Sequence, residues 1–145
     1  MSLFIREILL EDAIAITDLS LQLGYHVTAA GTKENLEIIT NSINDGAWVA
    51  FFEEKIAGWI HVFKTTRVES GTFGEIGGLV VDEAYRRKGI GKLLVDQAKQ
   101  WCINRDIPAL RVRCNSKRTE AHIFYTSLQF HENKEQKVFE IALRN

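Results

Sequence analysis

The sequence is poor in proline, cysteine and methionine: its 145 residues include one Pro, two Cys and one Met. One proline and ten glycines argue against a collagen-like, low-complexity or disordered chain. Cys102 and Cys114 lack the spacing of a metal site and need no disulfide in a reducing compartment, so we interpret both as small buried hydrophobic residues and expect no metal. What is present, 46% hydrophobic and 26% charged residues, is typical of one globular domain, which we expect to span residues 1–145.

A strong charge imbalance and long apolar runs are also missing. Eighteen Lys and Arg against 19 Asp and Glu give a formal charge of -1, so the bulk charge provides no attraction to nucleic acid or to an anionic membrane. No apolar run approaches the roughly 18 residues that a membrane-spanning helix needs, and the charged start at Arg6 and Glu7 is unlike a signal peptide. We therefore expect a cytoplasmic protein with no nucleic-acid partner and no membrane partner.

Hydrophobic periodicity predicts a mixed α/β (α+β) protein with the element order βααβββαβαββ. Because the fifth strand follows a helix, it should run parallel to the fourth in a mostly antiparallel sheet. The exposed edges of antiparallel strands invite pairing, so we expect a homodimer. The predicted strands cover 3–9, 47–52, 56–64, 73–81, 110–114, the neighbourhood of 130 and 138–143, and the predicted helices are centred on 11–24, 36–43, 90–102 and 121–128.

The most informative segment joins an apolar strand to an amphipathic helix through three consecutive cations and two glycines. Arg86, Arg87 and Lys88 supply positive charge, while Gly89 and Gly91 let an anion approach the main chain without meeting a Cβ atom. The first helical turn adds unpaired N–H groups and the positive end of the helix dipole. The segment therefore predicts a phosphate site. A solvated charge run before an ordinary helix is the alternative, which the glycines and the preceding strand disfavour.

Two familiar phosphate motifs are excluded by their spacing. A P-loop needs a glycine five residues before Gly91 and a Ser or Thr after Lys92, but these positions hold Arg86 and Leu93. A dinucleotide-binding fingerprint would need Gly or Ala where the chain has Leu94. The phosphate site must therefore be of another kind.

Two segments resemble the GNAT superfamily of acyl-CoA-dependent N-acetyltransferases. The run 86–91, Arg-Arg-Lys-Gly-Ile-Gly, matches that family's (Arg/Gln)-x-x-Gly-x-(Gly/Ala) motif. Residues 115–130 are similar to its strand-to-helix segment ending in Phe-Tyr-x-x-x-Gly-Phe. The element order matches too, so the resemblance covers essentially the whole chain. It implies the GNAT fold, with a sheet splayed between the fourth and fifth strands and acetyl-CoA as co-substrate in the cleft between them.

The resemblance also implies how acetyl-CoA is held. Its pyrophosphate would lie on the main chain of the 86–92 segment, and its pantetheine arm would pair with the freed strand edge at 79–81, as an added strand does. Asn115 resembles a position that hydrogen-bonds the arm, but an asparagine there is equally suited to cap a helix. The implied cofactor-binding residues are Leu79, Val80, Val81, Arg86, Arg87, Lys88, Gly89, Ile90, Gly91, Lys92, Asn115, Ala121 and Phe124.

Acetyl transfer to an amine needs one group that takes the amine's proton and another that protonates the leaving thiolate. Tyr125 resembles the family's general acid, and a phenol, with an ordinary pKa of about 10, can protonate a thiolate. A core aromatic is the alternative role for this tyrosine. The family's usual acidic base would stand at Gly78, so we expect Glu75, three residues earlier, to act directly or through a water; an exposed structural carboxylate is the alternative. His61 has a weaker claim, since a lone histidine in a strand is more often structural.

Two further positions bear on the cofactor site. Gly77 and Gly78 predict a β-bulge or a close backbone approach just before the strand residues implied to hold the arm. Gln129 stands where the family has glycine before Phe130, so a turn with positive φ at this position would be strained.

These features predict an N-acetyltransferase that moves the acetyl group of acetyl-CoA to a primary amine of a small molecule by direct attack in a ternary complex. In the family that the chain resembles, the acceptor site falls on the first two helices and their connection, here residues 21–35, and on the loop 65–72. No residue pattern there identifies the amine. A protein N-acetyltransferase and a non-catalytic acyl-CoA sensor are the alternatives, the second because the usual base position is empty.

Overall fold

A computed structural model describes residues 2–114 and 117–144, and the chain clusters into two compact units that meet in sequence at Arg113 and Cys114. No helix in the described part of the chain is long and apolar enough to cross a membrane. The second unit holds α4 (Thr119–Ser127). The first unit holds β1 (Leu3–Glu7), the 3-10 helix η1 (Leu10–Asp12), α1 (Ala13–Gln22), α2 (Ala29–Thr40), β2 (Asp45–Phe52), β3 (Lys55–Arg67), β4 (Gly71–Val81), the 3-10 helix η2 (Glu83–Tyr85), α3 (Ile90–Asn104) and β5 (Leu110–Val112).

The first unit is built on a five-stranded sheet in the order β1-β2-β3-β4-β5. The first four strands pair antiparallel, and β5 runs parallel to β4, as the crossover through α3 predicts. A two-residue turn at Glu53 and Glu54 joins β2 to β3, with φ angles of 49° and 69°. The pairing of β2 with β3 shifts by one residue between Ala50 and Phe51, which places Asp45 opposite Phe63 at the far end of the hairpin. The expected mixed, mostly antiparallel sheet is thus confirmed.

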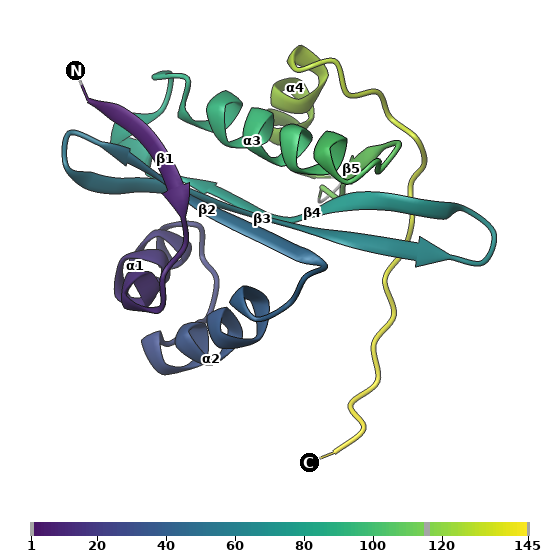
Figure 1. The fold of residues 1–145 in the computed structure, drawn as a ribbon, viewed down its shortest axis with the longest axis horizontal. Helices are drawn as coiled ribbons and strands as arrows, with labels where there is room; N and C mark the ends of the chain where they lie inside the picture. The colour runs from purple at the N-terminus through teal and green to yellow at the C-terminus, as the bar shows by residue number, and fades with distance from the viewer. Residues whose placement is uncertain (1, 115–116, 145) are drawn as a thin grey trace. The chain divides into compact units, whose positions relative to one another are not determined.

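Helices cover both faces of this sheet, α3 on one face and α1 and α2 on the other (Figure 1). On the α3 face, a Cβ atom at Gly58 would come within 3.3 Å of Leu94 and Ile90, so the absence of a side chain lets the helix pack closely. The opposite face is covered by a cluster of buried hydrophobic side chains, and Trp59 of β3 packs against this cluster. Its buried members are Ile8, Ala13, Ile16, Leu36 and Val49.

β4 is irregular where the sequence has two adjacent glycines. The pairing of β3 with β4 shifts register after His61, which lies opposite Gly78, because Val62 then lies opposite Ile76. Gly77 is the extra residue of this β-bulge. The bulge that the sequence predicts is therefore present.

β4 extends well beyond its short pairing with β5. Only Gly74–Ile76 of β4 lies in register with β5, whereas β4 continues to Val81. Residues 77–81 consequently have no register partner in β5. The splay that the GNAT resemblance implies between the fourth and fifth strands is expected along these residues.

The second unit differs from expectation at its end. Residues 130–144 form neither helix nor strand, so the strands predicted around Phe130 and over Val138–Leu143 are not present in the described chain. A run of β-prone residues becomes a strand only where another strand pairs with it, and the described part of this unit contains none. The side chains of Val138, Phe139, Ile141 and Leu143 are 80–91% exposed.

Candidate active site

The start of α3 is where the sequence predicts a phosphate site. Gly89 is the N-cap of this helix with φ of 80°, and no side chain caps the first turn. No heavy atom lies within 4 Å of the place that a Cβ of Gly89 would occupy, so the first turn is open to approach. Arg86, Arg87 and Lys88 are exposed immediately before it. Unpaired N–H groups, the helix dipole and three cations together favour a bound anion.

The loop before α3 is anchored at both ends. The N–H of Asp82 donates to the carbonyl of Ala57 at 2.7 Å, which ties the end of β4 to β3. The ring of Tyr85 packs on Phe52 with centroids 5.1 Å apart, and Ile90 at the start of α3 is buried. The exposed cations are therefore held at the start of the helix by a fixed backbone.

The strand edge implied to hold the pantetheine arm lies directly before this loop. Val80 is buried, while Leu79 and Val81 are half-buried. On the β3 side these residues pair with Ile60, Trp59 and Gly58, and on the other side they lie beyond the end of β5. That side can therefore accept the amide groups of an extended ligand.

The position where the family's acidic base would stand is closed by an indole. A Cβ atom at Gly78 would lie 2.5 Å from Cη2 and 2.7 Å from Cζ3 of Trp59. The Nε1 of Trp59 is buried and has no hydrogen-bond partner among the described residues. Glycine at position 78 is thus matched to Trp59, and an acidic side chain would not fit unless the indole moved.

Glu75, the base expected from the sequence, is half-buried and paired. Its Oε1 lies 3.4 Å from Nε of Arg113, and its side chain is 13% exposed. Arg113 comes directly after β5, so the pair joins β4 to the chain that leaves β5. The structure thus makes Glu75 a partner in an ion pair rather than an exposed strand-end carboxylate.

His61 has a partner that the sequence analysis missed. Its Nε2 lies 2.7 Å from Oδ1 of Asp45, and a Cβ atom at Gly77 would lie 2.8 Å from its Nδ1. The turn at 53–54 alone would pair Asp45 with Val62, and a register shift between Ala50 and Phe51 moves it opposite Phe63, on the same face as His61. Turn residues therefore gave no sufficient signal for this pair.

α4 brings together three of the predicted residues. Ala121, Phe124 and Tyr125 have the spacing of one helical face. The ring of Tyr125 packs edge-on against Phe124 and Phe130, with centroids 5.0 and 5.4 Å apart. Asn115 lies outside the described residues.

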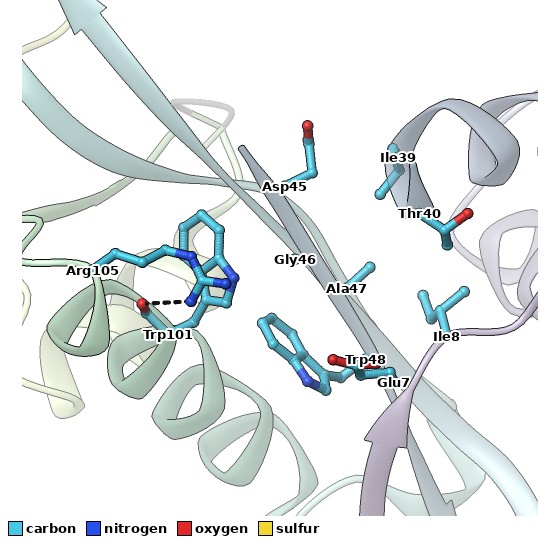
Figure 2. A pocket seen from close by; sticks show the side chains of 10 residues that line it. All are labelled: Glu7, Ile8, Ile39, Thr40, Asp45, Gly46, Ala47, Trp48, Trp101 and Arg105. Atoms are coloured by element: carbon cyan, nitrogen blue, oxygen red, sulfur yellow. Dashed lines mark hydrogen bonds between the residues drawn. The ribbon is translucent and has the colours of Figure 1, made fainter. Parts of the chain in front are cut away.

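A cavity of about 160 Å³ lies elsewhere in the first unit, where β1 ends and β2 begins (Figure 2). Arg105 stacks over the Trp101 ring at 4.2 Å and donates to the carbonyl of that residue at 3.3 Å. Both residues are in the last turn of α3 or just after it, whereas the phosphate site is at the start of this 15-residue helix. None of the residues predicted to bind acetyl-CoA lines this cavity. Its walls are Glu7, Ile8, Ile39, Thr40, Asp45, Gly46, Ala47, Trp48, Trp101 and Arg105.

Comparisons with known proteins agree with this geometry. Among solved structures, an aminoglycoside 6'-N-acetyltransferase from Acinetobacter haemolyticus is similar with a TM-score of 0.83 and 16% identity, covering 97% of this chain and 99% of that one. Glucosamine-6-phosphate N-acetyltransferase from Arabidopsis thaliana is similar with a TM-score of 0.82 and 22% identity, covering 98% and 100%. A transcriptional regulator from Bacillus halodurans is similar with a TM-score of 0.83 and 22% identity, covering 97% and 100%. At these identities the likeness is one of fold.

The family assignment comes from the sequence itself. A comparison with curated proteins finds no match. The model of the acetyltransferase (GNAT) family matches residues 14–130, which include both the start of α3 and the whole of α4. The chain therefore belongs to the GNAT acetyltransferase family.

Proposed function

We propose that this protein transfers the acetyl group of acetyl-CoA to a primary amine of a small molecule, by direct attack in a ternary complex. The observation that carries the proposal is the open first turn of α3 at Gly89, next to three exposed cations and a strand edge without a partner in β5. Among the fold relatives, one is named for aminoglycosides and one for glucosamine 6-phosphate, which supports a small amine as the acceptor.

The residues at this site suit coenzyme A. The main chain of 86–92 offers N–H groups and cationic side chains for the pyrophosphate. The edge at 79–81 offers main-chain groups to the amides of the pantetheine arm. Asn115, Ala121 and Phe124 complete the proposed contacts with the arm. The site thus combines an anion-binding helix start with an extended strand-like path.

Two side chains are proposed for the chemistry. Tyr125 donates a proton to the thiolate of coenzyme A as the carbon–sulfur bond breaks. Glu75, which the sequence predicts as the base, is held by Arg113 and supplies negative charge for a cationic acceptor. An N–H group near Val81 stabilises the oxygen of the tetrahedral intermediate.

Calorimetric titration with coenzyme A, followed by an assay of thiol release from acetyl-CoA, tests the function. The acceptor panel contains aminoglycosides, glucosamine 6-phosphate, polyamines, amino acids and a lysine-containing peptide. We expect coenzyme A to bind and at least one small amine to be acetylated. Binding without turnover on any acceptor would favour a sensor, and turnover on the peptide alone would favour a protein acetyltransferase. Absence of binding would remove the assignment.

Two substitutions separate cofactor binding from chemistry. Tyr125→Phe should lower kcat by roughly tenfold or more with unchanged affinity for coenzyme A, because only the transferred proton is lost. Gly89→Val should weaken coenzyme A binding, because a branched side chain would block the approach of the pyrophosphate to the helix start. Full kcat in the first variant, or full affinity in the second, would contradict the role assigned to that residue.

A further inference from the structure

We propose that His61, held by Asp45, is the group that takes the proton from the acceptor amine, a role that rests on the proposed acetyl transfer. The imidazole and the Glu75 carboxylate can first be placed on the sheet. Directly paired residues of an antiparallel sheet point to the same side, and Glu75 lies opposite Phe63. The rings of Phe63 and His61 contact each other, with centroids 5.5 Å apart. The imidazole and the Glu75 carboxylate therefore share one face of β3 and β4.

The contact with Asp45 determines the tautomer of the imidazole. Oδ1 of Asp45 lies 2.7 Å from Nε2, and a carboxylate accepts hydrogen bonds, so Nε2 carries the hydrogen. This leaves the lone pair on Nδ1. When Nδ1 gains a proton, the resulting imidazolium remains beside the Asp45 carboxylate. Asp45 is thus a positioning residue that determines which imidazole nitrogen carries the hydrogen.

The other imidazole nitrogen, Nδ1, lies next to Gly77 of the bulge. A Cβ atom on Gly77 would lie 2.8 Å from this nitrogen, so the missing side chain leaves it open at the bulge. The backbone at Gly77 is exposed, and the His61 side chain is 20% exposed. No described residue hydrogen-bonds to Nδ1. The bulge at Gly77 is therefore where we expect a small amine to reach the basic nitrogen.

The bulge also places this nitrogen close, along β4, to the strand edge proposed for the pantetheine arm. Gly77 is two residues before Leu79, the first residue of the edge proposed for the pantetheine arm. Two residues of strand span about 7 Å. Trp59 closes the place above Gly78 where a carboxylate would otherwise stand, and Glu75 is held by Arg113. Among the described residues, the imidazole therefore offers this face a basic nitrogen, Nδ1, with no hydrogen-bond partner.

The proposed proton path balances. Nδ1 removes one proton from the ammonium group, and the neutral amine nitrogen attacks the thioester carbonyl, forming a carbon–nitrogen bond. The carbon–sulfur bond then breaks, the thiolate takes a proton from Tyr125, and the phenolate is reprotonated by the second proton that leaves the nitrogen. His61 releases its proton to solvent, so the net products are the amide, free coenzyme A and one proton.

The test compares wild type with His61→Gln, using the best acceptor of the panel and kcat/KM from pH 6 to 9.5. At pH 7 we expect a loss of roughly 10²-fold in the variant. The loss should shrink as the pH approaches the amine's own pKa, about 10, because the amine then deprotonates without help. Affinity for coenzyme A should be unchanged. Asp45→Asn should show a smaller loss with the same dependence on pH. His131→Gln, an exposed histidine of the second unit, is the matched control and should match wild type.

Several outcomes would overturn the assignment. One is a His61→Gln variant whose kcat/KM at pH 7 is within threefold of wild type. Another is a loss of kcat/KM that stays constant from pH 6 to 9.5. The third is that Glu75→Gln, and not His61→Gln, shows the loss that shrinks as the pH rises. Gly77→Ala, which covers Nδ1 but leaves His61 in place, is the second probe and should reproduce the loss at pH 7 in a folded protein. If the wild-type protein shows no turnover, the proposed acetyl transfer is wrong. If the wild type turns over and His61→Gln keeps full turnover, only the role of His61 is wrong.

Discussion

At the scale of single residues, this fold depends on neighbouring residues that match each other in size or charge. Trp59 occupies the space above Gly78, and Gly77 leaves His61 uncovered. Asp12 is only 4% exposed, but Nη1 and Nη2 of Arg6 each lie 2.8 Å from one of its carboxylate oxygens. Each of these residues fits its place in the fold because its partner leaves space for it or pairs with its charge.

The pairing of Trp59 with Gly78 predicts a coupled effect on stability. Gly78→Ala should lower the free energy of unfolding by about 1–3 kcal/mol, because the new methyl group would lie 2.5 Å from the indole. In a Trp59→Phe background the same change should cost less, since the smaller ring leaves that space free. Urea unfolding of the four proteins measures the coupling. Strictly additive effects would show that the two side chains do not compete for space.

The buried Asp12 predicts a loss of stability in acid. Burial raises the pKa of this carboxyl group, but the hydrogen bonds from Arg6, the N–H of Leu9 and the charge of Arg6 outweigh burial and leave the pKa below its usual value. Its stabilising contribution is therefore complete above about pH 4 and is lost as the pH falls through the lower folded pKa. Asp12→Asn should cost about 1.5–3 kcal/mol at pH 7 and flatten the acid limb of the stability curve.

Urea unfolding between pH 3 and 7 checks this expectation. Asp18→Asn, an exposed residue of α1, serves as control and should leave the curve unchanged. An Asp12→Asn variant with the acid dependence of wild type would contradict the account.

At the scale of the elements, α1, α3 and α4 end in the same way. Gly24, Asp106 and Gln129 follow their helices with φ angles of 85°, 55° and 74°. In α4 the N–H of Phe130 donates to the carbonyl of Tyr125, and that of Gln129 donates to Thr126, the pattern of a Schellman motif. The Phe130–Tyr125 ring contact supplies its usual apolar contact. Gln129 thus has a positive φ, the case in which the sequence predicts strain at this position.

This ending predicts opposite signs for two substitutions. Gln129→Gly should stabilise by up to about 1 kcal/mol, because a left-handed residue with a Cβ costs about 1–2 kcal/mol and the greater freedom of glycine when unfolded offsets part of that gain. Gly24→Ala should destabilise by about 1 kcal/mol, since alanine would carry the strain that glycine avoids. Thermal and urea unfolding measure both. Equal signs would show that backbone strain does not dominate at these positions.

At the scale of the whole molecule, exposed apolar side chains point to self-association. Phe139 and Ile141 belong to an open run without secondary structure, and soluble monomers seldom expose such contiguous apolar surface. We therefore predict that the protein sediments as a dimer, with twice the mass of one chain. The double variant Phe139→Lys and Ile141→Lys should sediment as a monomer, because two buried charges would oppose the contact.

Sedimentation velocity at micromolar concentration distinguishes these species. Ile43→Lys, at an isolated exposed isoleucine between α2 and β2, should remain a dimer. A wild-type monomer, or a dimer that survives the two lysines at 139 and 141, would contradict this expectation.

Local patterns predicted much of the fold and part of the candidate site. The helical stripe of α3, the strands of the hairpins, the bulge at Gly77 and the open helix start at Gly89 all follow from neighbouring residues, because periodicity and backbone freedom act over a few positions. The family motif is equally local. The strand predicted at 138–143 was wrong for the described chain because a strand depends on a distant partner.

The register of the strands decided the rest. Asp45 meets His61, Trp59 covers Gly78 and Arg113 reaches Glu75 only because hairpin pairing, the bulge and the parallel crossover bring together residues 16 to 38 positions apart. A shift of one residue would turn each of these side chains to the opposite face of the sheet. Residue types therefore indicated an acyl-CoA site, whereas the folded sheet determined which acidic and basic groups share a face.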